Sequence, residues 1–327
     1  MSEDLKRRIL SRVADDLAGI ESALRENLEA HLEIVSEVAG HILFSGGKRL
    51  RPLLMVLASR LCGYTGGRET FFSTVFEYLH VATLLHDDLV DGAELRRGRP
   101  AAHSVWPGPV AVLTGDFLLA RSLTIASQTE DPEVIRVIAS ITENMSQGEI
   151  HQLTQKRNLN LTEPEYLEII RRKTAVLLQG SCRVGALIAG ADPSAVAALT
   201  DYGYHLGLAF QMADDLLDYT ADTAVLGKAV GADLREGKLT LPVIHALAAA
   251  QPDDRIRMEE MIQRTDFSTP DFEMLVDLLH RYGSIVYTRD RAAAHVRTAK
   301  ERLSGFPDSE EKSVMADIAD YALSRKS

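Results

Sequence analysis

The amino-acid sequence predicts an all-α fold, and three observations lead to it. Apolar residues recur at helical spacing along almost the whole chain, and no segment alternates as a strand would. Two long apolar segments each end in an acidic cluster of the same spacing. No linker rich in Pro, Gly or Ser divides the chain, so we expect residues 1–327 to form a single domain.

Composition limits the classes of function. The chain has a formal net charge of −11, which disfavours general binding to nucleic acid. Its two cysteines, Cys62 and Cys182, do not make a disulfide framework, which favours a reducing compartment. The first residues lack the apolar stretch of a signal peptide, and no window approaches eighteen uninterrupted apolar residues. We therefore expect a cytoplasmic protein without a transmembrane segment.

The N-terminal third predicts helices and then a basic turn. Residues 2–43 have the apolar spacing of a helix or helix pair packed on a core. Residues 45–52 contain two glycines and three cations, Lys48, Arg49 and Arg51, before a proline that opens a new helix. A Gly-Gly turn with lysine and arginine at a helix N-terminus suits phosphate. A solvated helix start explains the same pattern equally well.

A buried helix is expected over residues 69–91, because its residues are apolar on nearly every face. It ends in Asp87, Asp88 and Asp91. Asp87 and Asp91 lie one turn apart on one face, whereas Asp88 points about 100° away. Carboxylates at the negative end of a helix dipole repel one another, so the cluster predicts a bound cation. His80 lies two turns before Asp87, as a core residue or as a ligand.

The rest of the chain repeats this pattern. A loop at 92–109 contains Arg96, Arg97 and Arg99, which would either pair with the aspartates or face an anion. Helices are expected over 110–128, over 132–153, from about Thr162 and over 196–219. The third carries Lys173 and Thr174, and the fourth carries Gln211 and the second cluster, Asp214, Asp215 and Asp218. A glycine-punctuated loop with Lys228 and Lys238 follows, a helix begins at Leu241, and the helices after about 250 form scaffold.

Two acidic clusters on buried helices indicate two walls of one metal-filled cavity. Carboxylates prefer hard cations, and Mg²⁺ usually completes its coordination with water and phosphate oxygens. The basic segments would bind a diphosphate from the other side, and the apolar surroundings suit a hydrocarbon tail. Motifs for a Ser-His-Asp or Cys-His nucleophile are missing, as is a glycine-rich nucleotide fingerprint after a strand.

The order of these motifs resembles that of the trans-polyprenyl diphosphate synthases. The resemblance spans most of the chain. It rests on residues 46–52 (GGKRLRP), 84–91 (LLHDDLVD) with 96–98 (RRG), 210–218 (FQMADDLLD), 227–228 (GK) and 236–242 (EGKLTLP). One acidic motif alone would be weak evidence, but the ordered series is specific.

The resemblance implies an isoprenoid synthase-like bundle around a central apolar cavity, usually a homodimer, with about three Mg²⁺ per active site. It implies elongation of an allylic diphosphate by successive 1'-4 condensation with isopentenyl diphosphate. Isopentenyl diphosphate would bind Lys48, Arg51, His80 and Arg97. The allylic diphosphate would bind Arg96, Lys173, Thr174, Gln211, Lys228 and Lys238, of which Lys173, Thr174 and Lys228 are the expected catalytic residues. The metal ligands would be Asp87, Asp88, Asp91, Asp214 and Asp218.

Product length is expected to depend on residues 82 and 83, just before Asp87. Ala82 and Thr83 are small and resemble those of long-chain members that make quinone side chains. We expect a heptaprenyl to decaprenyl product, with octaprenyl as the single choice, and leave open a transient membrane contact for product release. Alternatively, these residues are small so that another helix can pack closely, and a farnesyl or geranylgeranyl synthase also stays open.

Three other functions fit the sequence less well. A terpene cyclase is disfavoured by the intact second acidic cluster and by the segment at 46–51. A non-catalytic subunit of a heteromeric synthase is disfavoured because such subunits tend to lose aspartates, and this chain keeps all six. A purely structural helical protein would leave the basic segments unexplained.

Overall fold

The all-α prediction is confirmed. The structure is a computed structural model and describes residues 2–28, 30–220, 231–264 and 268–324. Its helices are α1 (Ser2–Arg12), α2 (Ala14–Glu26), α3 (Glu33–Leu43), α4 (Leu50–Leu61), α5 (Glu69–Val90), α6 (Ala102–Val105), α7 (Gly108–Ser127), α8 (Pro132–Thr154), α9 (Glu163–Ile170), α10 (Val176–Ile188), α11 (Pro193–Thr220), α13 (Ala232–Arg235), α14 (Leu241–Ala249), α15 (Pro252–Gln263), α16 (Thr269–Arg281), α17 (Ser284–Arg302) and α18 (Glu310–Ser324). A π-helical turn, η1 (Arg171–Ala175), joins α9 to α10.

Two local features differ from the expectation. The segment 2–43 forms three helices rather than one or two. The loop at 92–109 contains a small hairpin of β1 (Leu95–Arg96) and β2 (Arg99–Pro100), where we expected no strand. Arg97 and Gly98 form its two-residue turn with φ of 52° and 73°. Positive φ at both turn positions matches the twist of a tight hairpin.

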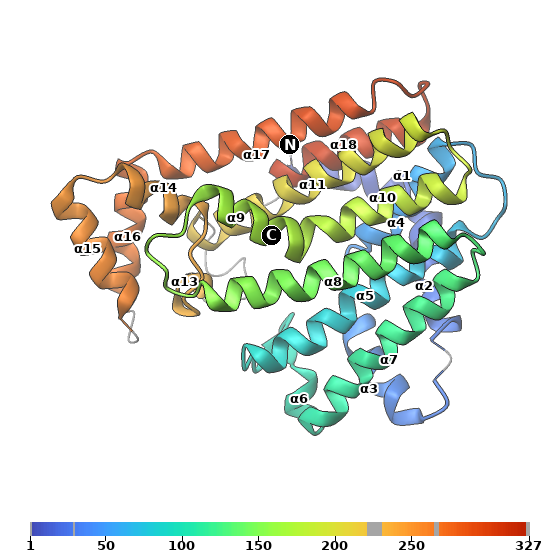
Figure 1. The fold of residues 1–327 in the computed structure, drawn as a ribbon, viewed down its shortest axis with the longest axis horizontal. Helices are drawn as coiled ribbons and strands as arrows, with labels where there is room; N and C mark the ends of the chain where they lie inside the picture. The colour runs from blue at the N-terminus through green and yellow to red at the C-terminus, as the bar shows by residue number, and fades with distance from the viewer. Residues whose placement is uncertain (1, 29, 221–230, 265–267, 325–327) are drawn as a thin grey trace.

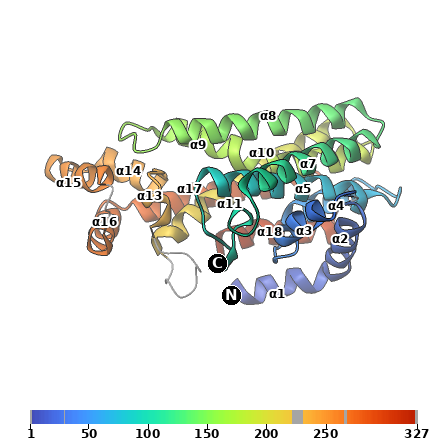
Figure 2. The ribbon, with the colours of Figure 1, turned by 90° about the horizontal axis from the view of Figure 1, so that it is seen from below.

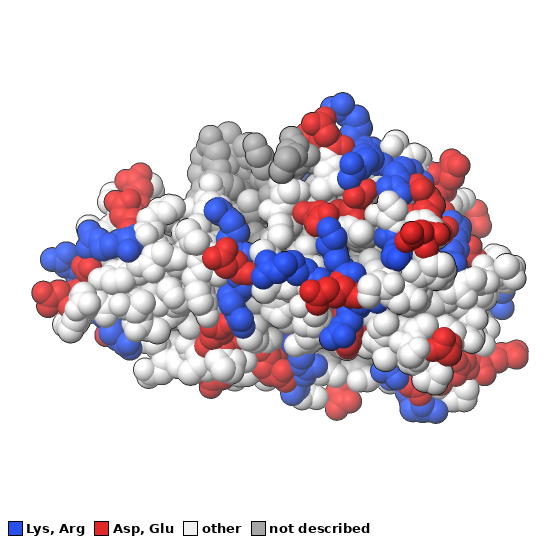
Figure 3. All heavy atoms as spheres, turned by 90° about the horizontal axis from the view of Figure 1, so that it is seen from above, with Lys and Arg blue, Asp and Glu red and all other residues white. Residues whose placement is uncertain are grey.

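The helices form an elongated bundle (Figure 1). α13–α16 make up one end, and α1–α4 lie toward the other. α11 packs against α10 and α17, α4 packs against α10, and α5 packs against α7. Seen from below, α8 runs along one long face and α1 along the opposite one (Figure 2). Figure 3 shows acidic and basic side chains interspersed on another face, with no extended basic area on it.

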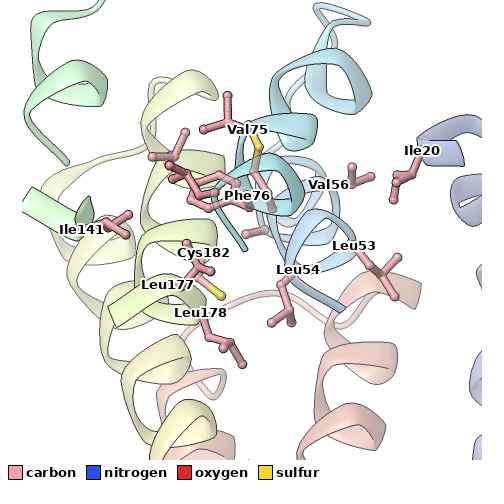
Figure 4. Packing of buried hydrophobic residues seen from close by; sticks show 14 of the residues in the cluster. Ile20, Leu53, Leu54, Val56, Val75, Phe76, Ile141, Leu177, Leu178 and Cys182 are labelled. Atoms are coloured by element: carbon pink, nitrogen blue, oxygen red, sulfur yellow. The ribbon is translucent and has the colours of Figure 1, made fainter. Parts of the chain in front are cut away.

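Buried apolar side chains gather in two clusters. The first core joins α1–α5, α7, α8, α10, α18 and the first half of α11 and includes Phe76, Leu118, Ile141 and Leu178. In Figure 4, Phe76 of α5, Ile141 of α8 and Cys182 of α10 lie around a common space. The second core joins α9, the last part of α11 and α14–α17 and includes Tyr166, Met212, Leu241 and Leu275. Both cysteines are free thiols.

One described helix, α7, has the length and hydropathy of a membrane-spanning helix. Within its most apolar 18-residue window, 39% of the residues are buried inside the structure. The helix packs against α5 and α8 and buries Ala111 and Leu118 completely. Because core helices of globular proteins have the same composition, α7 is weak evidence for a membrane span.

Candidate active site

The first acidic cluster lies across the C-terminal end of α5. Asp88 is 1% exposed and accepts a hydrogen bond from Arg96, with 2.9 Å between Oδ1 and Nε. Its Oδ2 is buried and has no hydrogen-bond partner among the residues that the structure describes. Asp91 accepts hydrogen bonds from Lys238 (Nζ to Oδ2, 2.9 Å) and Lys156 (Nζ to Oδ1, 3.4 Å). As helical geometry predicted, Asp88 is directed away from Asp91, here toward the hairpin.

Asp87 differs from both neighbours. Within the described part of the chain, its carboxylate has no hydrogen bond or ion pair. Burial raises the pKa of Asp87 to about 6, opposed by the positive charge of Lys173. Burial acts in the same direction on Asp91, but the hydrogen bond from Lys238 outweighs it and lowers the pKa of that carboxyl. Asp87 is therefore the carboxylate of this cluster whose two oxygens are both open to a cation within the described residues.

The second acidic cluster lies in the last two turns of α11. Asp215 is 3% exposed and accepts hydrogen bonds from Tyr166 (Oη to Oδ2, 2.5 Å) and Gln211 (Nε2 to Oδ1, 2.8 Å). Burial and the charge of Asp233 raise the pKa of Asp215 to about 8. Asp218 accepts the backbone N–H groups of Ala232 and Asp233, each at 3.2 Å, and so fixes the start of α13.

Lys173 and Thr174 lie in η1, which packs between α8 and the second acidic helix, α11. Lys173 pairs with Glu149 and donates to Gln152 Oε1 at 2.8 Å, both on α8. Thr174 Oγ1 donates to Gln211 Oε1 on α11 at 2.9 Å. One pocket is lined by several residues of the predicted allylic set: Lys173, Thr174, Gln211 and Lys238. Lys228, the remaining lysine of that set, lies outside the described residues.

A second group of cations gathers beside α5. Arg51 is half-buried, its Nε is buried without a hydrogen-bond partner among the described residues, and desolvation lowers its pKa. Burial lowers the pKa of His80 well below its usual value, and Arg51, Arg97 and Arg96 lower it further. Three residues of the predicted isopentenyl diphosphate set, Arg51, His80 and Arg97, are thus near one another. Arg96, predicted with the allylic set, lies in this group as well.

The glycine turn closes this cationic group. Arg97 donates a hydrogen bond to the carbonyl of Gly46. A Cβ atom added at Gly47 would lie 3.3 Å from Nη1 of Arg97, so glycine leaves room for the guanidinium. Lys48 has an exposed side chain, and its Nζ lies 5.4 Å from the ring centre of Tyr321 on α18.

Sequence reasoning assigned no role to Arg49, which holds this turn in place. The residue is 4% exposed and pairs with Glu21 and Glu77, each at 2.6 Å. It also donates to the carbonyl of Leu43. The sequence of residues 48–51 does not distinguish this arginine from its neighbours. It differs from them in its burial, which depends on the tertiary structure. Tyr166 was missed for the same reason.

The predicted chain-length residues lie one to two turns before Asp87 on α5. Ala82 is 4% exposed, and Thr83 Oγ1 donates to the carbonyl of His80 at 2.8 Å. Deeper in the bundle a small apolar pocket is lined by Phe72, Val75, Phe76, Ala126, Thr129, Val134, Ile138 and Val184. An apolar interior therefore continues beyond Ala82.

The donor chemistry of the site suits a hard divalent cation. Among the residues described, no three His, Cys, Asp or Glu side chains are arranged as a ready metal cluster. Asp88 and Asp91 are neutralised by Arg96, Lys156 and Lys238 instead. The free groups, Asp87 and the Oδ2 atom of Asp88, are carboxylate oxygens, which Mg²⁺ prefers.

The sequence matches the polyprenyl synthetase family over residues 32–279. The chain belongs to this family. It is 34% identical to the octaprenyl diphosphate synthase of Escherichia coli over 97% of this chain and 98% of that protein. It is 36% identical to a short chain isoprenyl diphosphate synthase of Methanothermobacter thermautotrophicus over 90% of this chain and 91% of that protein.

A solved structure has the same fold. The polyprenyl synthase of Caulobacter crescentus, complexed with calcium and isoprenyl diphosphate, matches with a TM-score of 0.92 and 39% identity. The match covers 98% of both chains. The chain is therefore an enzyme of the trans-prenyltransferase class that elongates prenyl diphosphates, as the motifs predicted, and its family is Mg²⁺-dependent.

Proposed function

We propose that this polyprenyl synthetase condenses isopentenyl diphosphate with an allylic diphosphate to give a long all-trans product, with octaprenyl diphosphate as the specific choice. The observation that carries the proposal is the presence of two cationic sites beside the first acidic cluster. One contains Lys173, Thr174 and Lys238, and the other contains Arg51, His80 and Arg97. Two separate anion sites suit two diphosphate substrates, whereas cyclisation of a single substrate needs only one.

The residues of the pocket act on the allylic substrate. Lys173 and Lys238 hold its diphosphate by charge, while Thr174 and Gln211 orient it through hydrogen bonds. Mg²⁺ bound by Asp87, Asp91, Asp214 and Asp218, about three ions in all, would neutralise the charge that develops on the departing diphosphate. The cations of the pocket stabilise the same charge, so the allylic C–O bond ionises. Asp88 accepts the hydrogen bond from Arg96 and so fixes the position of its guanidinium.

The cationic group beside α5 serves the second substrate. Arg51 and Arg97 would hold isopentenyl diphosphate, and His80, neutral at pH 7 because its pKa is depressed by burial and by Arg51, would donate one hydrogen bond. The double bond of this substrate attacks the allylic carbon. The released diphosphate then accepts the proton that leaves, which gives a chain one isoprene unit longer.

The proposal of a long product rests on the interior beyond Ala82. A growing chain that starts at Asp87 passes Ala82 and Thr83 before it reaches Phe76 and Ile141. A Cβ atom added at Gly180 would lie 2.2 Å from Ile141 and 3.6 Å from Phe76, so these side chains pack closely against the α10 backbone at Gly180. The names of related enzymes range from short chain to octaprenyl, so product length needs its own experiment.

Chain length is tested by filling the tunnel near its entrance. Ala82→Tyr and Thr83→Phe should each shorten the product by several isoprene units and retain condensation, and chromatography of the extracted products measures this. Ile256→Phe, at an exposed site on α15, is the control and should leave the product unchanged. Unchanged product length in both tunnel variants, with activity retained, would show that the chain does not pass this point.

We propose a cytoplasmic homodimer whose product serves quinone biosynthesis. Exposed apolar side chains on α7, Leu113 at 65% and Leu123 at 40%, support a subunit interface there. Sedimentation of the wild type and of a Leu113→Asp variant tests this, and a monomeric wild type would contradict it. A non-catalytic subunit is the second candidate, and condensation by the purified chain alone would exclude it.

A further inference from the structure

The helix that carries Lys173 and Thr174 contains a local irregularity. From Glu163 to Ile188 the chain is helical without a break, but η1 (Arg171–Ala175) is a π-helical turn. Such turns are rare and occur frequently at functional sites. Both predicted catalytic residues that the structure describes, Lys173 and Thr174, lie within it. Lys173 reaches α8 on one side and Thr174 reaches α11 on the other.

Two glycines, one on each of these neighbouring helices, contact the backbone of this turn. A Cβ atom added at Gly148 of α8 would lie 2.7 Å from the backbone nitrogen of Lys173. A Cβ atom added at Gly207 of α11 would lie 2.5 Å from the Cα atom of Ala175. Both distances are far below van der Waals contact, so any side chain at either position must displace the π turn or its own helix. Neither glycine has a positive φ, so close packing, not backbone conformation, requires them.

Gly203 shows that close packing alone does not explain this arrangement. It lies one turn before Gly207 on α11, and a Cβ atom added there would lie 2.6 Å from the carbonyl oxygen of Leu178. The contact is equally tight, but it falls on a regular part of α10, away from the π turn. Gly207 is also one turn before Gln211, which accepts the hydrogen bond from Thr174. A displacement at Gly207 would therefore change the geometry between Thr174 and Gln211.

We propose that Gly148 and Gly207 are positioning residues for the allylic diphosphate, a role that rests on the proposed function. They let α8 and α11 approach the π turn from both sides and so fix where Lys173 and Thr174 enter the pocket. An alanine at position 207 would push Ala175 away by about 1 Å to regain normal contact. Misplacement of a catalytic group by about 1 Å can reduce the rate by about 100-fold.

The test compares Gly207→Ala with Gly203→Ala, because both variants add one methyl group to the same helix at an equally tight contact. Both should lower the melting temperature by similar amounts. Gly207→Ala should lower kcat/KM for the allylic primer by about 10- to 100-fold, and Gly203→Ala by less than about 3-fold. KM for isopentenyl diphosphate should change little in either, because Arg51, His80 and Arg97 lie outside the π turn. Equal effects of both variants on primer kinetics would overturn the proposal.

A double variant tests whether Gly207 acts through Thr174. If it does, Thr174→Ala with Gly207→Ala should lose little more activity than Thr174→Ala alone, since the shared interaction is already gone. Multiplicative losses would overturn the proposal. Gly148→Ala repeats the test from α8. If both Gly148→Ala and Gly207→Ala fail to fold while Gly203→Ala folds, the glycines are structural and the proposal is wrong.

The proposed function and this inference fail in different ways. A wild-type protein that makes no polyprenyl diphosphate from the two substrates would contradict the proposed function. An active wild type whose Gly207→Ala and Gly203→Ala variants behave alike would contradict the positioning role only.

Discussion

The two acidic clusters have the same spacing and different surroundings. The first lies at the end of α5, and its carboxylates meet the side chains of Arg96, Lys156 and Lys238 from loops and helix ends. The second lies inside α11, where Asp215 is held by Tyr166 and Gln211. Spacing decides which face of a helix a carboxylate occupies, but the neighbouring elements decide what it binds.

This difference separates carboxylates that can take part in the reaction from carboxylates that stabilise the fold. The side chains of Lys156 and Lys238 can leave Asp91 when a metal ion and a diphosphate arrive, so the first cluster can change partners. Asp218 holds two backbone N–H groups at the start of α13, and Asp215 is buried with two fixed donors. We therefore expect substitutions in the first cluster to reduce turnover, and substitutions around Asp215 to reduce stability as well.

The largest effect is expected for Asp87→Asn. Loss of a charged ligand where charge develops should reduce turnover by about three powers of ten or more, measured with Mg²⁺ and both substrates. The variant should fold, because it removes a half-buried carboxylate that has no partner within the described residues. Asp308→Asn, at a fully exposed side chain, is the control and should behave as the wild type. Near-normal turnover in Asp87→Asn would contradict the metal assignment.

Variants of the cationic residues at the two substrate sites should differ in the substrate whose KM they raise. Arg51→Ala and His80→Ala should raise KM for isopentenyl diphosphate by about 10- to 100-fold and affect the allylic primer less, because lost charge-assisted hydrogen bonds cost about 1.5–3 kcal/mol each. Lys173→Ala should weaken binding of the allylic primer instead. Steady-state kinetics with each substrate varied in turn measures both. The assignment of the two sites fails if the three variants affect both substrates equally.

Tyr166→Phe tests the second cluster. It removes the hydroxyl that donates to buried Asp215, so we expect a loss of stability of about 1–3 kcal/mol, measured by urea unfolding. Turnover should fall by less than about 10-fold, since the Tyr166 hydroxyl donates to Asp215. Tyr287→Phe removes a similar bond to Glu163, which is outside the site, and should leave turnover unchanged. A loss of turnover in Tyr166→Phe without loss of stability would contradict the division between the clusters.

The smallest effect concerns stability and pH in the metal-free protein. The pKa of Asp87 is raised by burial from 3.8 to about 6, so folding disfavours its charged form. This cost is absent below the unfolded pKa, grows as pH rises from about 4 to 6, and is complete above that. Asp87→Asn should therefore be more stable than wild type at pH 7 by about 1–3 kcal/mol, and equal to it near pH 3. A constant difference across this range would show that the pKa is not raised.

Much of the fold follows from local pattern. The helix expected over 69–91 is α5, and the helix expected over 196–219 is α11, each within three residues at either end. The direction of Asp88 away from Asp91 also follows from helical geometry alone. Helix propensity and apolar spacing are local properties, so one sequence suffices to predict them.

Long-range pairs could not be predicted in this way. Asp91 and Lys238 are 147 residues apart, and Arg49 and Glu77 pair across 28 residues. Sequence spacing contains no information on such tertiary contacts. The π turn was not predicted, because a regular α-helix already accounts for the apolar spacing of this segment. Tyr166 and Leu177 are 11 residues apart, about three α-helical turns, which would place both on one face. In the structure, Tyr166 belongs to the second core and Leu177 to the first.

The boundary between the two cores therefore passes through the π turn. Ala175 is buried in the second core and Val176 in the first, and α11 crosses the same boundary near Leu208 and Ala209. Thr174 and Gln211 join these two crossing helices at that level. A diphosphate held by both residues would bridge the two cores and link their unfolding into one cooperative transition. Bound substrate should thus sharpen thermal unfolding as well as raise its midpoint.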